Sequence, residues 1–161
     1  MSTRISLTLI CSGMVMTEKL KLGIAGLGRG FTVMLPTLSL HPKLDVIAAV
    51  DTRPEARVQF ETDFGGAAYD TIEAMCSDAD IDAVYVTTPH QLHAEHTVIA
   101  AQMGKHILVE KPMAITLEDC TRMIDAANAA GVYLLVGHSH SYDFPILETH
   151  RLIASGDYGS P

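Results

Sequence analysis

Short runs of apolar residues alternate with amphipathic segments along most of the chain. The apolar runs predict buried strands at residues 21–25, 44–50, 67–69, 81–86, 106–109 and 133–136. The segments between and after them predict helices at residues 31–40, 54–64, 71–76, 91–103, 116–130 and 145–154. Runs that stay apolar throughout belong to strands covered on both faces, which is typical of a parallel sheet. The pattern therefore predicts a doubly wound α/β fold that binds its ligand at the carboxyl ends of the strands.

The first predicted strand leads into a glycine-rich turn, Gly26-Leu27-Gly28-Arg29-Gly30, and then into a helix. Glycine permits positive φ and close approach of the main chain, and the start of a helix offers unpaired N–H groups. A turn of this kind binds the pyrophosphate of a dinucleotide. The usual spacing is G-x-G-x-x-G/A, but Phe31 stands at the third glycine position. We therefore expect the close contact between helix and strand to be made differently here.

The second predicted strand ends at Asp51, where an acidic residue reaches the ribose hydroxyls of NAD in this kind of fold. The alternative is that Asp51 caps the next helix, since the sequence Asp-Thr-Arg-Pro also suits a helix start. Arg53 leaves the choice of cofactor open, because an arginine there can bind a 2′-phosphate or stack on adenine. We predict NAD as the cofactor, with NADP possible.

Composition narrows the class of protein. The 161 residues suffice for one domain with a proper core, and 48% of them are hydrophobic. The net charge of −8 argues against nucleic acid and anionic membranes as partners. The three cysteines, Cys11, Cys76 and Cys120, are widely spaced, and we interpret them as reduced thiols of a cytoplasmic protein.

We divide the chain into three parts. Residues 1–18 are predicted to be a disordered extension upstream of the true start, and the alternative is a targeting segment. Residues 19–140 form the predicted dinucleotide-binding domain. Residues 141–161 are predicted to begin a further, truncated domain, because the chain stops on a turn.

The tripeptide Glu110-Lys111-Pro112 follows a central strand. A lysine at that end of the sheet faces the ligand crevice, and proline restricts the main chain beside it. Glu110 is placed to hold the Lys111 ammonium in position. The alternative is an ordinary surface lysine at the end of a strand.

Two segments carry a resemblance to a known family. Residues 87–93 (TTPHQLH) and 100–112 (AAQMGKHILVEKP), together with the glycine turn, resemble the glucose-fructose oxidoreductase/inositol dehydrogenase/MocA family. The resemblance covers residues 20–161. It implies an NAD(P)-dependent oxidoreductase with an N-terminal Rossmann domain. It also implies a C-terminal α/β domain that carries the substrate, often the oligomer interface, and a histidine or aspartate base.

The resemblance also assigns residues. It makes Lys111 the catalytic lysine, places Thr87, Pro89 and His93 beside the nicotinamide, and implies a cis Lys111–Pro112 bond. His90 stands where many relatives have asparagine. The predicted cofactor-binding residues are Gly26, Gly28, Arg29, Gly30, Asp51, Arg53, Thr87, Thr88, Pro89, His90, His93, Glu110 and Lys111.

Histidines gather near the same crevice. His90, His93 and His96 are three residues apart, and His138 and His140 follow the last strand. Zinc is an alternative ligand for such groups, but no carboxylate or thiolate completes a set, and we predict no metal. We predict instead that His138 and His140 reach the substrate.

The segment 137–143 and the glycine turn most resemble one branch of the family, the phthalate cis-dihydrodiol dehydrogenases. This branch implies oxidation of 4,5-dihydro-4,5-dihydroxyphthalate to a catechol. The substrate carboxylates would then need cationic partners.

Two functions follow from the sequence. The first is an NAD(P)-dependent oxidoreductase that takes a hydride from a hydroxylated ring compound, a dihydrodiol or a sugar or polyol, and forms homo-oligomers. The second is a dinucleotide-binding or regulatory module without turnover. The tyrosine–lysine class of dehydrogenases is excluded, because no tyrosine has a lysine four residues later.

Overall fold

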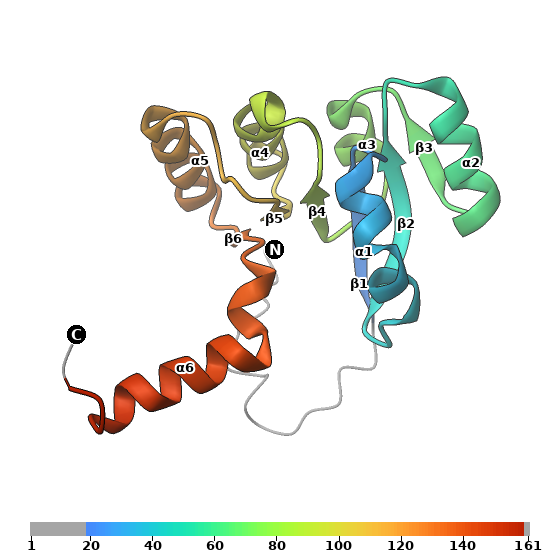
Figure 1. Ribbon diagram of the computed structural model, residues 1–161. Helices are drawn as coiled ribbons and strands as arrows, with labels where there is room; N and C mark the ends of the chain where they lie inside the picture. Colours follow the sequence, from blue (N-terminus) through green and yellow to red (C-terminus); the bar gives the residue numbers. More distant parts are fainter. Residues whose placement is uncertain (1–18, 160–161) are drawn as a thin grey trace.

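The computed structural model describes residues 19–159, so the predicted extension at 1–18 lies outside the described residues. Six parallel strands form one sheet in the order β3-β2-β1-β4-β5-β6 (Figure 1). The order reverses between β1 and β4, which is the point where ligands bind in sheets of this type. The strands are β1 (Leu20–Ala25), β2 (Leu44–Val50), β3 (Ala67–Tyr69), β4 (Ala83–Val86), β5 (His106–Val109) and β6 (Leu134–Val136).

Helices connect successive strands, and the predicted doubly wound fold is confirmed. They are α1 (Arg29–Leu40), α2 (Pro54–Phe64), α3 (Ile72–Asp78), α4 (His93–Gln102), α5 (Leu117–Ala130) and α6 (Phe144–Ser155), with short 3₁₀ helices η2 (His90–Leu92) and η3 (Ser139–Tyr142). The single helix predicted at 91–103 is therefore a 3₁₀ turn followed by α4. The strand predicted at 81–86 begins two residues later, at Ala83.

The core has two layers, one on each face of the sheet. Phe31 and Leu38 of α1 and Phe60 of α2 pack on one face. Helices α3, α4 and α5 cover the other face, where Met75, Ala100 and Met123 are buried. Strand residues that are apolar on both sides satisfy both layers, which explains the continuous apolar runs in the sequence.

Two helices begin on threonine caps. The Thr116 hydroxyl accepts the Asp119 N–H at 3.1 Å, as predicted for the start of α5. The Thr71 hydroxyl accepts the Ala74 N–H at 3.2 Å at the start of α3. Asp70, which is also a residue type that caps helices, lies one position too early and remains exposed.

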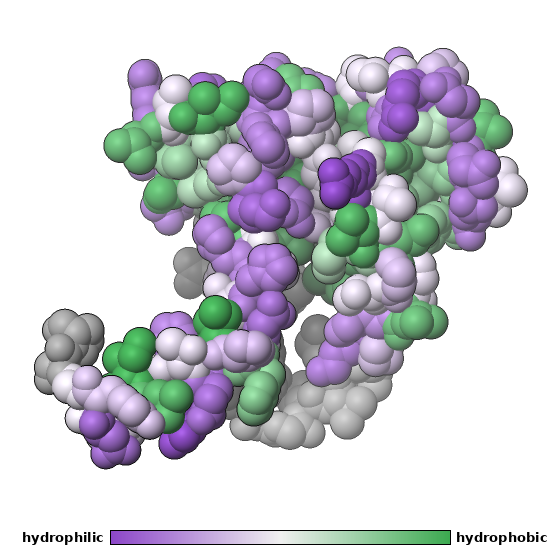
Figure 2. All heavy atoms as spheres, viewed as in Figure 1, coloured by the Kyte–Doolittle hydropathy of each residue, from purple (hydrophilic) through white to green (hydrophobic). Residues whose placement is uncertain are grey.

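The last described helix stands apart from the sheet. Helix α6 has no buried residues, packs mainly against η3, and extends away from the strands (Figure 1). Figure 2 shows apolar residues on its surface, and Phe144 is 78% exposed. Across residues 19–159 the structure has no helix with the length and apolar character that a membrane crossing requires.

Candidate functional site

The glycine turn has the conformation of a phosphate-binding loop. Gly26 has φ +94°, and a Cβ there would lie 3.0 Å from the main chain of Thr88, so only glycine fits. Gly28 precedes α1, no side chain caps that helix, and a Cβ at Gly28 would meet nothing within 4 Å. Because no side chain caps α1, the N–H groups of its first turn are available to donate hydrogen bonds to an anion.

Gly30 makes the close contact that the G-x-G-x-x-G spacing assigns to its third glycine. A Cβ at Gly30 would lie 3.3 Å from the Thr87 Cβ at the end of β4. Because α1 begins at Arg29, Gly30 lies in its first turn, against the strand. Phe31 turns into the core instead, 5.9 Å from the Phe64 ring. This is the different solution that the unusual spacing required.

Thr87 ties the turn to the centre of the sheet. Its main-chain N–H donates to the Ala25 carbonyl at 2.8 Å. Its hydroxyl donates a hydrogen bond to the Gly26 carbonyl oxygen at 2.5 Å. Thr87 as a whole is 8% exposed. Thr87 thus holds the glycine turn in place from the interior of the protein.

Asp51 lies at the carboxyl end of β2, beside the glycine turn. One carboxylate oxygen accepts the Leu27 N–H at 2.9 Å and the Arg53 Nη2 at 2.9 Å. The other oxygen accepts the Arg53 N–H at 2.9 Å and its Nε at 3.0 Å. The Arg53 Nη2 also donates to the Leu27 carbonyl at 3.1 Å. Asp51 therefore joins β2 to the turn and does not cap α2, whose N-cap is Arg53.

These bonds set the charge of Asp51. Burial, the largest influence, raises its pKa, but the bonds from the Arg53 side chain and from the Arg53 and Leu27 main chains outweigh it and lower the pKa to about 2. Asp51 is thus an anion near neutral pH. Its side chain is 10% exposed, whereas that of Arg53 is 52% exposed, so Arg53 is the partner that can move away.

A cleft of about 300 Å³ continues from Asp51 along the ends of the strands. The predicted residues Gly26, Asp51, Thr88 and Pro89 are among those that line it. The walls that the sequence analysis missed come from the start of α3 and from η2 and α4. These further lining residues include Asp70, Thr71, Ile72, Glu73, Leu92, Glu95, His96 and Ile99.

The three histidines of residues 90–96 have separate environments. His90 is exposed on η2, and its ring meets that of His93 edge-on at 5.4 Å between centroids. His93 is fully buried, with Nδ1 2.9 Å from the Pro112 carbonyl oxygen and Nε2 2.9 Å from that of Thr88. His96 lines the cleft, and burial lowers its pKa more than nearby Glu95 and Glu73 raise it.

Lys111 follows β5, and its peptide bond to Pro112 is cis, as the resemblance implied. Glu110 does not hold the ammonium, which corrects the sequence prediction. The Glu110 carboxylate instead accepts a hydrogen bond from the Tyr85 hydroxyl and, at 3.2 Å, the Lys111 N–H. Within residues 19–159 the exposed Lys111 ammonium has no hydrogen bond or ion pair.

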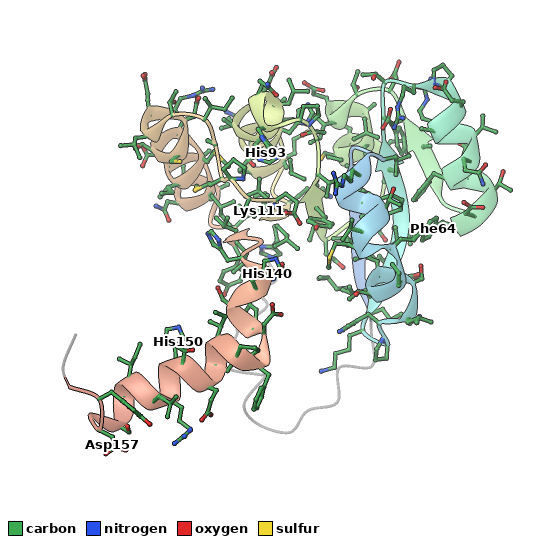
Figure 3. All side chains as sticks on the ribbon, viewed as in Figure 1. Phe64, His93, Lys111, His140, His150 and Asp157 are labelled. Carbon is green, nitrogen blue, oxygen red and sulfur yellow. The ribbon has the colours of Figure 1, made fainter. Side chains whose placement is uncertain are left out.

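The remaining predicted residues lie at the same edge or on the surface. Arg29 is exposed at the start of α1. Val109 pairs with Val136, so Lys111 and His138 each come two residues after a matched pair of strand ends. His140 lies on η3 (Figure 3), and its Nδ1 is 2.8 Å from the Asp143 carboxylate. Among the residues described, no three metal-ligating side chains gather at one point.

The geometry agrees with comparisons to known proteins. Residues 20–138 match the model of the oxidoreductase family with an NAD-binding Rossmann fold that is named after glucose-fructose oxidoreductase, inositol dehydrogenase and MocA. The chain belongs to this family. The predicted Rossmann fold and the resemblance to the family are thereby confirmed.

Three members of the family indicate its range. The chain is 51% identical over 141 residues to 1-carboxy-3-chloro-3,4-dihydroxycyclohexa-1,5-diene dehydrogenase of Comamonas testosteroni, covering 87% of this chain and 36% of that one. It is 34% identical over 141 residues to an NADP(+) scyllo-inositol 2-dehydrogenase of Bacillus subtilis, covering 86% and 38%. The WlbA dehydrogenase of Bordetella pertussis, solved with NADH and UDP-GlcNAcA, superposes with a TM-score of 0.86 at 28% identity, covering 91% and 42%.

The chain thus spans about two-fifths of the length of these relatives. Its residues fit the cofactor of the family. The open seat at Gly28, the uncapped start of α1 and the Asp51 carboxylate occur together at the switch point of the sheet. The turn would hold the pyrophosphate, Asp51 a ribose, and the cleft beside it the adenine.

Proposed function

We propose that this chain is the cofactor-binding portion of an NAD-dependent dehydrogenase that oxidises a carboxylated dihydroxycyclohexadiene. The first substrate to test is 4,5-dihydro-4,5-dihydroxyphthalate. The observation that carries the proposal is the 51% identity to a dehydrogenase whose name specifies a carboxylated dihydroxycyclohexadiene. Other relatives are named for inositol and sugar derivatives, so polyols are the competing substrate class.

Asp51 supports NAD over NADP. A carboxylate whose pKa is lowered to about 2 stays ionised and accepts hydrogen bonds from ribose hydroxyls, but it repels a 2′-phosphate. All four bonds to its two oxygens come from protein donors, and Arg53 supplies three of them. A ribose hydroxyl would therefore replace donors of the Arg53 side chain. Arg53 is then free to lie against the adenine.

Lys111 is the residue that we assign to the chemistry. When NAD is bound, its nicotinamide ring supplies the acceptor for a hydride from the substrate carbon. The Lys111 ammonium would donate a hydrogen bond to the substrate hydroxyl oxygen and stabilise the negative charge that develops there. Its lack of any partner within residues 19–159 leaves it available for this contact. The hydroxyl proton would pass to a base, the histidine or aspartate that the family resemblance places in the C-terminal domain.

His138 and His140 are our candidates for the substrate carboxylates. His138 is exposed two residues after Val136, in step with Lys111 on the neighbouring strand. The His140 imidazole is paired with Asp143, and a carboxylate ligand would compete with that residue. Both histidines can donate hydrogen bonds to a carboxylate.

Calorimetric titration of the chain with NAD and with NADP tests the cofactor assignment. We expect at least about tenfold tighter binding of NAD, because one repelled charge at close range costs roughly that much. Equal affinities would contradict the role of Asp51. Failure to bind either nucleotide would overturn the proposed function as a whole.

Turnover is tested with a fusion in which this chain replaces the matched portion of the Comamonas testosteroni relative. NADH formation at its absorbance band is followed with 4,5-dihydro-4,5-dihydroxyphthalate and with myo-inositol. We expect turnover of the first compound only. Turnover of inositol alone would overturn the substrate class, and NADH binding without any turnover would favour the binding module.

We further propose a cytoplasmic homo-oligomer. Cys76 and Cys120 are free thiols, which suits a reducing compartment. The apolar residues left exposed on α6 favour association with another surface. Light scattering at increasing protein concentration measures the assembly, and a monomer throughout would contradict it.

A further inference from the structure

The three residues of the Glu110-Lys111-Pro112 tripeptide are held very differently. The Glu110 N–H donates to the Val86 carbonyl at 2.9 Å, so the main chain is still tied to β4 there. Both oxygens of the Glu110 carboxylate accept hydrogen bonds. On the other side, the Pro112 carbonyl oxygen meets the His93 ring at 2.9 Å. The flanking residues are therefore fixed, while the Lys111 side chain has no hydrogen bond or ion pair to any residue in the described part of the chain.

Tyr85 supports the first of these residues. It lies on β4, is 1% exposed, and donates its hydroxyl to the Glu110 carboxylate. Burial raises the pKa of the Tyr85 phenol, and the bond to Glu110 raises it further, so the phenol remains a donor at any working pH. The other Glu110 oxygen accepts the Lys111 N–H at 3.2 Å, so the position of this carboxylate is passed directly to the Lys111 main chain.

His93 supports the other side. Its ring is 0% exposed and lies between two carbonyl oxygens, those of Thr88 and Pro112, each at 2.9 Å. Thr88 follows β4 and Pro112 follows β5, so one imidazole contacts both of these segments. A carbonyl oxygen only accepts, and a neutral imidazole carries one N–H, so the tautomer decides which of the two contacts is a donated hydrogen bond.

We infer that Tyr85 and His93 are positioning residues that fix the main chain on either side of Lys111. Neither side chain is exposed to a ligand, and each bonds a neighbour of Lys111. The inference rests on the proposed function for its meaning, because positioning matters when Lys111 meets the substrate. A long lysine side chain is flexible, so its reach is defined only if its Cα is held still.

The size of the effect follows from the chemistry. A displacement of about 1 Å at a reacting group costs on the order of 10²-fold in rate. Loss of one hydrogen bond that anchors the main chain opens it locally and increases amide exchange by about tenfold. Both effects should appear without loss of the fold, since the sheet and the glycine turn do not depend on these two bonds.

The variants remove the bonds and keep the bulk. Tyr85→Phe removes only the hydroxyl, and His93→Phe removes both ring nitrogens, with His93→Gln as a second variant that keeps an amide donor. Tyr69→Phe is the matched control, because the Tyr69 hydroxyl bonds the Asp78 carboxylate at 3.1 Å on the opposite edge of the sheet. Melting temperature and NADH affinity confirm that each variant is folded.

The first measurement uses the chain itself and needs no turnover. Amide exchange of Glu110 and Lys111 is followed by NMR, together with the methyl signal of Lys111 after reductive ¹³C-methylation. We expect exchange to increase by about tenfold and the methyl signal to shift in Tyr85→Phe and His93→Phe, with partial rescue in His93→Gln and no change in Tyr69→Phe. Unchanged exchange and an unchanged signal in both variants would overturn the inference.

The second measurement uses the fusion. We expect His93→Phe to lower kcat by about 10²-fold and Tyr85→Phe by about tenfold, each with the KM for NAD within about threefold. Adding either change to Lys111→Ala should cause no further loss, because both act through the same residue. If Lys111→Ala abolishes turnover and the two variants leave kcat intact, the inference fails. If Lys111→Ala retains turnover, the proposed function fails, while the exchange data still decide whether the main chain is held.

Discussion

Asp51 and Lys111 are two charged residues at the carboxyl ends of strands, and the protein treats them in opposite ways. Asp51 receives four hydrogen bonds on its own carboxylate. Lys111 has no bond to its ammonium within residues 19–159, but its two neighbours are anchored by buried side chains. After β2 the Asp51 side chain is held by hydrogen bonds, and after β5 the main chain beside Lys111 is held.

In the proposed function, one edge of the sheet serves both cofactor binding and chemistry. A ribose must be recognised in one place, so a fixed carboxylate with a stable charge is useful. A side chain that interacts with a reacting substrate needs an end group without protein partners, carried by a main chain that is held in place.

We expect the largest effect on kcat when the Lys111 ammonium is removed. Lys111→Ala in the fusion should lower kcat by about 10³-fold, because hydrogen bonding to the developing alkoxide is lost. NADH affinity, measured by calorimetry, should stay within about tenfold. Lys43→Ala, a change of an exposed lysine before β2, is the control. A loss of both kcat and NADH affinity would show that Lys111 binds the cofactor, as we propose for Asp51.

The glycine turn should respond next. Gly26→Ala forces a side chain into a site with φ +94° and a main-chain atom 3.0 Å away, so NADH affinity of the chain should fall by about 10²-fold. Gly28→Ala meets nothing within 4 Å of the new Cβ in the ligand-free structure and should cost less. Fluorescence titration with NADH measures both. Equal losses would mean that the shape of the turn does not determine binding.

Replacing the held carboxylate should change selectivity rather than abolish binding. Asp51→Asn removes the negative charge but keeps hydrogen-bonding atoms beside Leu27 and Arg53. We expect the preference for NAD over NADP to fall by about tenfold, because Arg53 no longer has an anionic partner and can meet a 2′-phosphate. Paired titrations with the two nucleotides measure this, and an unchanged ratio would place the selectivity elsewhere.

The smallest effect concerns pH. Arg53→Met should raise the pKa of Asp51 from about 2 towards its ordinary value of 3.8. The lowered pKa stabilises the folded chain above about pH 4, and this contribution is lost as the pH falls towards about 2.

The variant should therefore be less stable than the wild type near neutral pH, by under about 2 kcal/mol, and the difference should shrink on acidification. Urea unfolding across this pH range measures it. Arg122→Met, which removes an exposed ion pair with Asp119 on α5, should show a smaller change. A pH-independent difference would separate the stability effect from Asp51.

Several elements were predictable because local chemistry marks their ends. Strand β2 and helix α2 have the predicted bounds, since Pro54 starts the helix and Gly65, at φ +67°, ends it. Local sequence does not show that Thr71 rather than its neighbour Asp70 caps α3, because both residue types cap helices and only the packing of α3 selects one. The predicted boundaries of the domains and the predicted site roles stay predictions.

The roles of Tyr85 and His93 beside Lys111 could not be predicted from the sequence, because their partners are distant along the chain. Tyr85 lies in an apolar run and has the pattern of a core residue, and its partner Glu110 is 25 positions away. The two meet only because Tyr85 pairs with Leu108 in the sheet register. His93 was expected to contact the cofactor, and its two carbonyl partners become visible only when the segments after β4 and β5 are placed together.

Thr87 has a consequence for how affinity for the nucleotide can be adjusted. Its hydroxyl meets the Gly26 carbonyl from inside the protein, at a position that is 8% exposed. Exchange of that hydroxyl for a methyl group, as in valine, keeps the shape of the side chain and unties the loop. In the proposed function, cofactor affinity therefore depends in part on a hydroxyl that bonds the glycine turn from the protein interior.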